Sequence, residues 1–151
     1  MKKNVLIWIY PDCLHPNGAA LTAYPDAPRV FVFDEPNILA SEMTLKRIAF
    51  IYESLLEIKL IEIRKGNPVQ ELIEALDEFN CDTIAVVISV DPRFQEIVDE
   101  LRQHNIQFEI FLVEPFVQLA AGEAEKLNLK RFSKYWNQVK RRALSLNESL
   151  F

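Results

Sequence analysis

Five short apolar runs, each separated from the next by residues with helical spacing, constrain this chain more than any other feature. The first run, NVLIWIY at residues 4–10, is continuously apolar, which is typical of a strand buried on both faces. Further strands are predicted at 29–35, 60–64, 83–89 and 107–113. Strands that alternate with helices pair in parallel through right-handed crossovers. The sequence therefore predicts an α/β fold with a doubly wound, five-stranded parallel sheet in three layers.

Local signals indicate where the intervening helices begin. Ser41 or Thr44 is a suitable N-cap for the first, Pro68 occupies the first position of a helix over 67–79, and Asp91-Pro92 opens a helix that runs to His104. In the first helix an apolar face is expected at Leu45, Ile48, Ala49, Ile51, Tyr52, Leu55 and Leu56.

Length and composition favour one globular domain. The chain has 151 residues, half of them apolar, and no apolar run reaches the roughly 20 residues that span a bilayer. We therefore expect a cytoplasmic protein without a membrane segment. The two cysteines form no CxxC pair and are expected to be free thiols, and the sequence assigns no metal-binding residue. The net charge of −5 argues against a whole surface that binds nucleic acid.

The C-terminal part of the chain differs from the rest. Residues 126–142 contain seven basic residues and no acidic one, with Phe132, Tyr135 and Trp136 among them. We expect an α/β domain over 1–122 and a helical C-terminal extension of the same domain over 123–151. Cations and aromatic rings suit single-stranded nucleic acid, but the helical spacing of the apolar residues favours packing against the domain or a second copy. A homo-oligomer would cover this face, and Trp136→Ala should then cost about 3 kcal/mol.

Several segments carry a resemblance that covers most of the chain. They are LIWIYPDCLHPNGAAL at 6–21, VFVFDE followed by LKRIAFIYESLLEI with Arg47, Phe50, Ser54 and Leu55, then IRKGNPVQELIEAL at 63–76, the Asp91-Pro92 step, and RFSKYW at 131–136. Together they resemble the N-terminal domain of the DNA photolyase and cryptochrome family. The arginines that this family carries around the first-loop aspartate are replaced here by Tyr10, Pro11, Cys13 and Leu14.

The resemblance implies a Rossmann-like sheet with strand order 3-2-1-4-5. In some members of the family this domain holds an antenna such as a folate or deazaflavin, while a following helical domain binds FAD and DNA. The 151 residues contain no segment like that helical domain, so no FAD binding is expected. A separate photolyase-like helical chain would be needed for photorepair.

Candidate ligand-binding residues follow from the predicted winding. Glycine-rich phosphate loops are excluded, because the three glycines lie far apart. In an open parallel sheet, ligands bind at the carboxyl ends of strands where the winding reverses, which is here between strands one and four. The residues expected there are Asp12, His15, Asn17, Asp34, Glu35, Ser89 and Asp91. Ordinary loop polarity, and helix capping by Asp91, account for the same residues.

No catalytic residue can be assigned. Cys13 and His15 are two residues apart and diverge in an extended chain, which argues against a thiolate–imidazole pair. The first functional hypothesis is a non-enzymatic binding or interaction module with a small antenna-type or nucleotide-like ligand. The alternatives are a subunit of a split photolyase-type repair or blue-light photoreceptor system, and an unidentified nucleotide-dependent enzyme.

Overall fold

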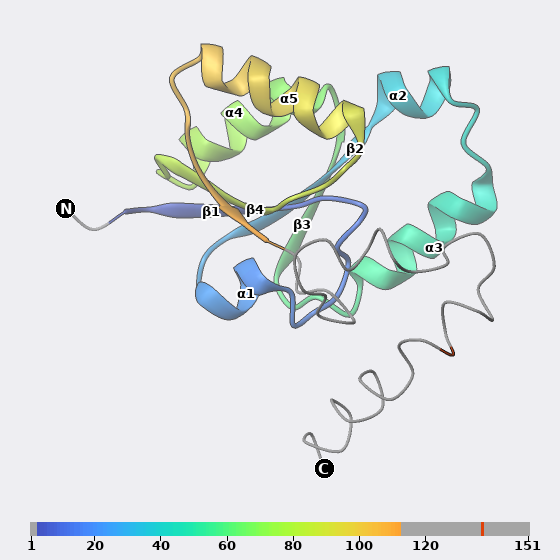
Figure 1. Cartoon of the computed structure of the whole chain (residues 1–151), viewed down its shortest axis with the longest axis horizontal. Helices are drawn as coiled ribbons and strands as arrows, with labels where there is room; N and C mark the ends of the chain where they lie inside the picture. The colour runs from blue at the N-terminus through green and yellow to red at the C-terminus, as the bar shows by residue number, and fades with distance from the viewer. Residues whose placement is uncertain (1–2, 113–136, 138–151) are drawn as a thin grey trace. The chain divides into compact units, whose positions relative to one another are not determined.

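A parallel five-stranded sheet forms the centre of the molecule (Figure 1). The computed structural model describes residues 3–112 and residue 137, and the fold below is that of the unit over residues 1–113. The strands are β1 (Val5–Ile9), β2 (Arg29–Asp34), β3 (Ile61–Gly66), β4 (Thr83–Val87) and β5 (Gln107–Phe111). Their order is β3-β2-β1-β4-β5 and every neighbouring pair is parallel, which confirms the predicted fold class and strand order.

Helices cover both faces of the sheet, as Figure 1 shows. The helices are α1 (Ala19–Ala23), α2 (Glu35–Ala40), α3 (Leu45–Leu55), α4 (Pro68–Glu78) and α5 (Pro92–Gln103). The core has two halves. Side chains from α4 and α5 pack on one face of the sheet around Leu6, Trp8 and Ile84, and side chains from α1 and α3 pack on the other around Ile7, Ile9 and Phe31. Strand β1 lies between them and is buried along its whole length, as its apolar run predicts.

Capping side chains begin most of these helices. Asn67 accepts hydrogen bonds from the backbone N–H groups of Val69 and Gln70, and Asp91 accepts one from that of Arg93. At α3 the cap is Thr44, whereas Ser41 is the residue that ends α2. These bonds satisfy N–H groups that have no partner within the helix.

Two helices were not expected from the sequence. Pro36 was interpreted as the end of a strand, but it stands in the first turn of α2, where the Asp34 side chain caps the backbone N–H of Asn37. Proline is tolerated there because the first N–H groups of a helix have no internal partner. Helix α1 has only five residues and is too short for a periodic signal.

The predicted apolar face of α3 is only partly correct. Ile51 and Leu55, four residues apart, are buried against the sheet, but Leu45, Tyr52 and Leu56 are exposed. One row of the helix therefore contacts the core, and the flanking apolar rows lie outside the contact. The predicted extension over 123–151, its boundary at residue 122 and the packing of Phe132, Tyr135 and Trp136 lie outside the described residues.

Leu60 occupies an unfavourable backbone position, which leads to a stability prediction. Its φ of 60° is in the left-handed region, where Asn80 and Asn105 also lie, and its side chain is 91% exposed. A left-handed conformation costs a residue with a bulky side chain about 1–2 kcal/mol and costs asparagine less. Leu60→Asn should raise the free energy of unfolding by about 1 kcal/mol, measured by urea denaturation. Leu56→Asn, at an exposed position with a negative φ of −64°, is the control and should give no gain.

Candidate functional site

A cleft opens at the carboxyl ends of β1 and β2, beside the start of α5. Its volume is about 90 Å³. Helices α2 and α3 form its outer wall with Asn37, Ile38, Met43 and Arg47, and the sheet forms its floor. Three carboxylates predicted from the sequence lie at the cleft, namely Asp12, Asp34 and Asp91. The cleft lies beside the place where the winding reverses, because its strand residues come from β1 and β2 and none comes from β4.

Asp91 is held by a buried tyrosine. The Tyr10 hydroxyl donates to Asp91 Oδ2 at 2.6 Å, and the second oxygen, Oδ1, accepts the backbone N–H of Arg93 at 3.1 Å. The Tyr10 ring packs edge-on against Trp8 and Phe94. Burial, followed by the hydrogen bond to Asp91, raises the pKa of Tyr10 above its ordinary value. Tyr10 is therefore a neutral hydrogen-bond donor that fixes the carboxylate.

Asp34 connects β2 to α5 through an ion pair. Arg93 Nε donates to Asp34 Oδ2 at 2.7 Å, and Arg93 Nη2 lies 3.4 Å from Oδ1. Asp34 Oδ1 also accepts the backbone N–H of Asn37. The hydrogen bond to Asp34 raises the pKa of Arg93, and the fork geometry suits a carboxylate. The Asp34 carboxylate thus links the end of β2 to α5 and also caps the first turn of α2.

The loops after β1 and β4 meet through Asp12 and Ser89. The Ser89 hydroxyl donates to Asp12 Oδ2 and accepts the backbone N–H of Asp91 at 3.1 Å. The prediction that these two loops come together is thus confirmed by a contact between residues 77 positions apart in the chain.

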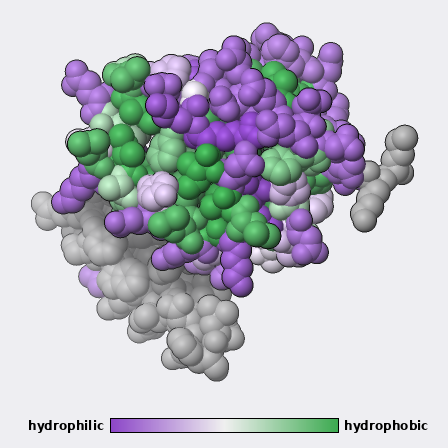
Figure 2. Space-filling model, turned by 180° about the vertical axis from the view of Figure 1, so that it is seen from behind, coloured by the Kyte–Doolittle hydropathy of each residue, from purple (hydrophilic) through white to green (hydrophobic). Residues whose placement is uncertain are grey.

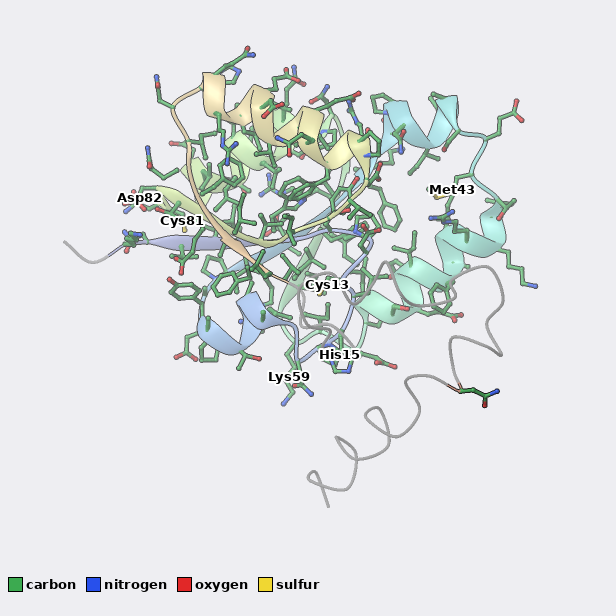
Figure 3. The ribbon with its side chains drawn as sticks, viewed as in Figure 1. Cys13, His15, Met43, Lys59, Cys81 and Asp82 are labelled. Carbon is green, nitrogen blue, oxygen red and sulfur yellow. The ribbon has the colours of Figure 1, made fainter. Side chains whose placement is uncertain are left out.

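The cleft is not lined by the other four predicted residues, of which Ser89 contacts a lining residue. The backbone N–H of Asn17 donates to His15 Nδ1 at 3.0 Å, and His15 borders a separate recess with Cys13 beside α1 (Figure 3). Glu35 points to an exposed contact with Lys65, 3.5 Å away. Burial raises the pKa of the Cys13 thiol, and within the described residues no hydrogen bond joins its side chain to the His15 ring. A thiolate–imidazole pair is therefore not formed there.

Four side chains at or beside the cleft were missed by the sequence reasoning. Tyr10 and Arg93 hold the carboxylates, while Asn37 and Arg47 line the outer wall. Within residues 3–112, no acidic side chain pairs with the Arg47 guanidinium and no group bonds the Asn37 side-chain amide. The only early signal was the place of Arg47 in the family resemblance.

The described residues contain no group of three histidine, cysteine or acidic side chains that could hold a metal ion. No helix among them is long and apolar enough to cross a membrane. The sequence matches no model of a known protein family and no curated protein.

The buried hydroxyl of Tyr10 makes stability depend on alkaline pH. A raised pKa means that the folded state keeps the phenol proton when the unfolded chain releases it near pH 10, so this contribution is present below pH 10 and is lost above it. Tyr10→Phe should cost about 1 kcal/mol at pH 7 through the lost hydrogen bond and should flatten the decline in stability above pH 10. Urea denaturation between pH 7 and 11 measures both effects.

Tyr52→Phe is the matched control, because the Tyr52 hydroxyl bonds to no described residue. An equal decline above pH 10 in the parent and Tyr10→Phe chains would contradict the assignment.

Proposed function

We propose that this chain is a photolyase-like α/β domain that acts as a non-catalytic binding module, with a small ligand held in the cleft beside α2 and α3. The Arg47 guanidinium carries this proposal, since it lines a cleft whose other charged groups are mostly engaged and pairs with no acidic side chain of residues 3–112. The strand order agrees with the family resemblance and supports the same assignment.

The charges of the cleft indicate the kind of ligand. Asp34 and Asp91 each accept hydrogen bonds at both oxygens, and Asp12 accepts one from Ser89. Arg47 and the side-chain amide of Asn37 remain as donors on the outer wall. Donors in such a place suit a carboxylate, a phosphate or a ring oxygen. Ile38 and Met43 beside them offer apolar contact to a flat ring.

The size of the cleft limits what fits without movement. A volume of about 90 Å³ is below the roughly 300–1,000 Å³ of most small-molecule sites. A folate, a deazaflavin or a nucleotide would enter with one ring only, or would displace the outer wall. Helix α2 buries none of its residues, so outward movement of α2 alone exposes little apolar surface.

Native mass spectrometry of the unheated protein tests the proposal. We expect a bound small molecule, with visible absorbance if it is an antenna-type chromophore. Folic acid, a deazaflavin and ATP serve as added probes. Arg47→Ala should weaken the bound probe about tenfold or more, because a charge-assisted hydrogen bond is lost.

Lys46→Ala is the matched control for that variant, because Lys46 is the adjacent exposed cation and does not line the cleft. Equal binding by the Arg47→Ala and parent chains would refute the assignment of the ligand to this cleft.

Photorepair activity is not expected of the chain alone. A non-catalytic module should neither bind FAD stoichiometrically nor repair pyrimidine dimers in light, because no segment resembles the helical domain that encloses the flavin in the family. Reconstitution with FAD, illumination and a dimer-containing oligonucleotide measures both. Light-dependent repair by the isolated chain would overturn the non-catalytic proposal.

The exposed apolar side chains of α3 favour a second candidate, a subunit that docks with a separate photolyase-like helical chain. Leu45, Phe50 and Tyr52 are 84%, 66% and 49% exposed, and exposed apolar groups that cluster on one element mark contact surfaces. Co-purification of a colourless protein with such a helical chain would favour this candidate over the ligand module.

A further inference from the structure

Strand β3 forms an open edge of the sheet. All six of its residues pair with β2 on one side, and among the described residues no strand pairs with its other side. An edge strand presents a row of N–H and C=O groups that can pair with another strand. In Figure 1, β5 crosses in front of the sheet, so the β3 edge lies at the back and faces the viewer in Figure 2.

Exposed apolar side chains lie near the start of this edge strand, whereas Lys65 farther along it is an exposed cation. Leu60 and Leu56, which precede β3, are 91% and 62% exposed, and Phe79 at the end of α4 is 38% exposed. Figure 2 shows hydrophobic side chains near the middle of this face, bordered by hydrophilic ones. Leu60 has a left-handed backbone conformation and contributes little to the core of its own chain. We therefore expect its side chain to contact another molecule.

The charged residues of β3 are spaced so that a second copy of β3, running antiparallel, would place opposite charges against each other. Glu62 and Arg64 flank Ile63 on either side, and their side chains lie together on the face of the sheet that α4 covers. If two copies of β3 run antiparallel with Ile63 opposite Ile63, then Glu62 of each copy lies opposite Arg64 of the other. Opposite charges in directly facing positions stabilise such a pair of strands. Ile61 then faces Lys65, whose aliphatic stem can cover it.

From these observations we infer that β3 pairs with β3 of a second copy, antiparallel and centred on Ile63, so that two five-stranded sheets join into one. The contact is two-fold symmetric and uses the β3 edge of both copies at once, so pairing through this edge stops at a dimer. Arg64 remains supported in its own chain by Glu71 and Glu78 while it faces the second Glu62. The dimer does not depend on the ligand proposed for the cleft, which lies at the carboxyl end of the sheet between other elements.

Analytical ultracentrifugation of the full chain tests the dimer. The parent chain should sediment as a concentration-dependent dimer. Glu62→Lys should raise the dissociation constant at least tenfold, because it places two lysines opposite two arginines. Glu100→Lys on the exposed face of α5 changes the net charge equally and should leave the constant unchanged. Leu60→Asn should weaken the dimer although it stabilises the fold, so loss of folding cannot explain the result.

Cysteine cross-linking tests the register. Facing residues of paired strands are close enough for a disulfide, so Ile63→Cys should give a covalent dimer under mild oxidation. Lys65→Cys should not, because residue 65 faces residue 61 of the second copy. The parent chain, whose free cysteines Cys13 and Cys81 are not part of β3, is the blank.

A parent chain that is monomeric at 100 µM, or a dimer unchanged by both Glu62→Lys and Leu60→Asn, would overturn the inference. Equal cross-linking of Ile63→Cys and Lys65→Cys would overturn the register.

Discussion

The complete burial of β1 is the constraint on which the rest of the structure depends. All five residues of this strand are buried, because β2 and β4 pair with its two sides and helices cover both faces of the sheet. A strand enclosed in this way can be apolar throughout, and it must lie at the centre of the sheet. The chain winds outward from it in two directions, toward β3 and toward β5. The reversal leaves the carboxyl end of β1 open between two loops, and this opening is where polar side chains gather.

Hydrogen bonds at this opening compensate for the partial burial of its carboxylates. Carboxylates that lose contact with water need hydrogen bonds to replace it. Asp91 has Tyr10 and a backbone N–H, and Asp34 has Arg93 and a backbone N–H. The described residues contain no buried side-chain nitrogen or oxygen that lacks a partner. The network therefore holds α2 and α5 to the ends of β2 and β4 without a bound ligand. The Arg47 side chain at the cleft is exposed and pairs with no acidic side chain of residues 3–112, so it is the group to which an added anion would bind under the proposal.

Sequence periodicity predicted the sheet and the three longer helices because each of these elements carries a repeating signal several residues long. The N-caps Asn67 and Asp91 follow from the same local logic. Pro36 misled the interpretation, since a proline ends a strand and begins a helix equally well. The cleft was predicted in part: Asp12, Asp34, Ser89 and Asp91 come from loops whose place follows from topology, whereas Tyr10 and Arg93 act on partners 81 and 59 positions away. No local pattern encodes such pairs. His15 lines a small recess with Ile9 and Val87 at the carboxyl ends of β1 and β4, where the winding reverses, whereas Asn17 lines neither this recess nor the cleft.

The same packing that fixes the sheet leaves the outer wall of the cleft weakly held. Helix α4 buries five residues and α5 buries four, whereas α3 buries two and α2 none. Local opening costs least where few apolar groups leave the core, so α2 is the described helix that can separate at the lowest free energy. Asp34 is the anchor of this helix, because it caps α2 and pairs with Arg93. A ligand that bonds to Arg47 from the floor of the cleft would add a second anchor to the outer wall. Ligand binding would then be coupled to closure of this wall, and the free-energy cost of ordering α2 and α3 would lower the observed affinity.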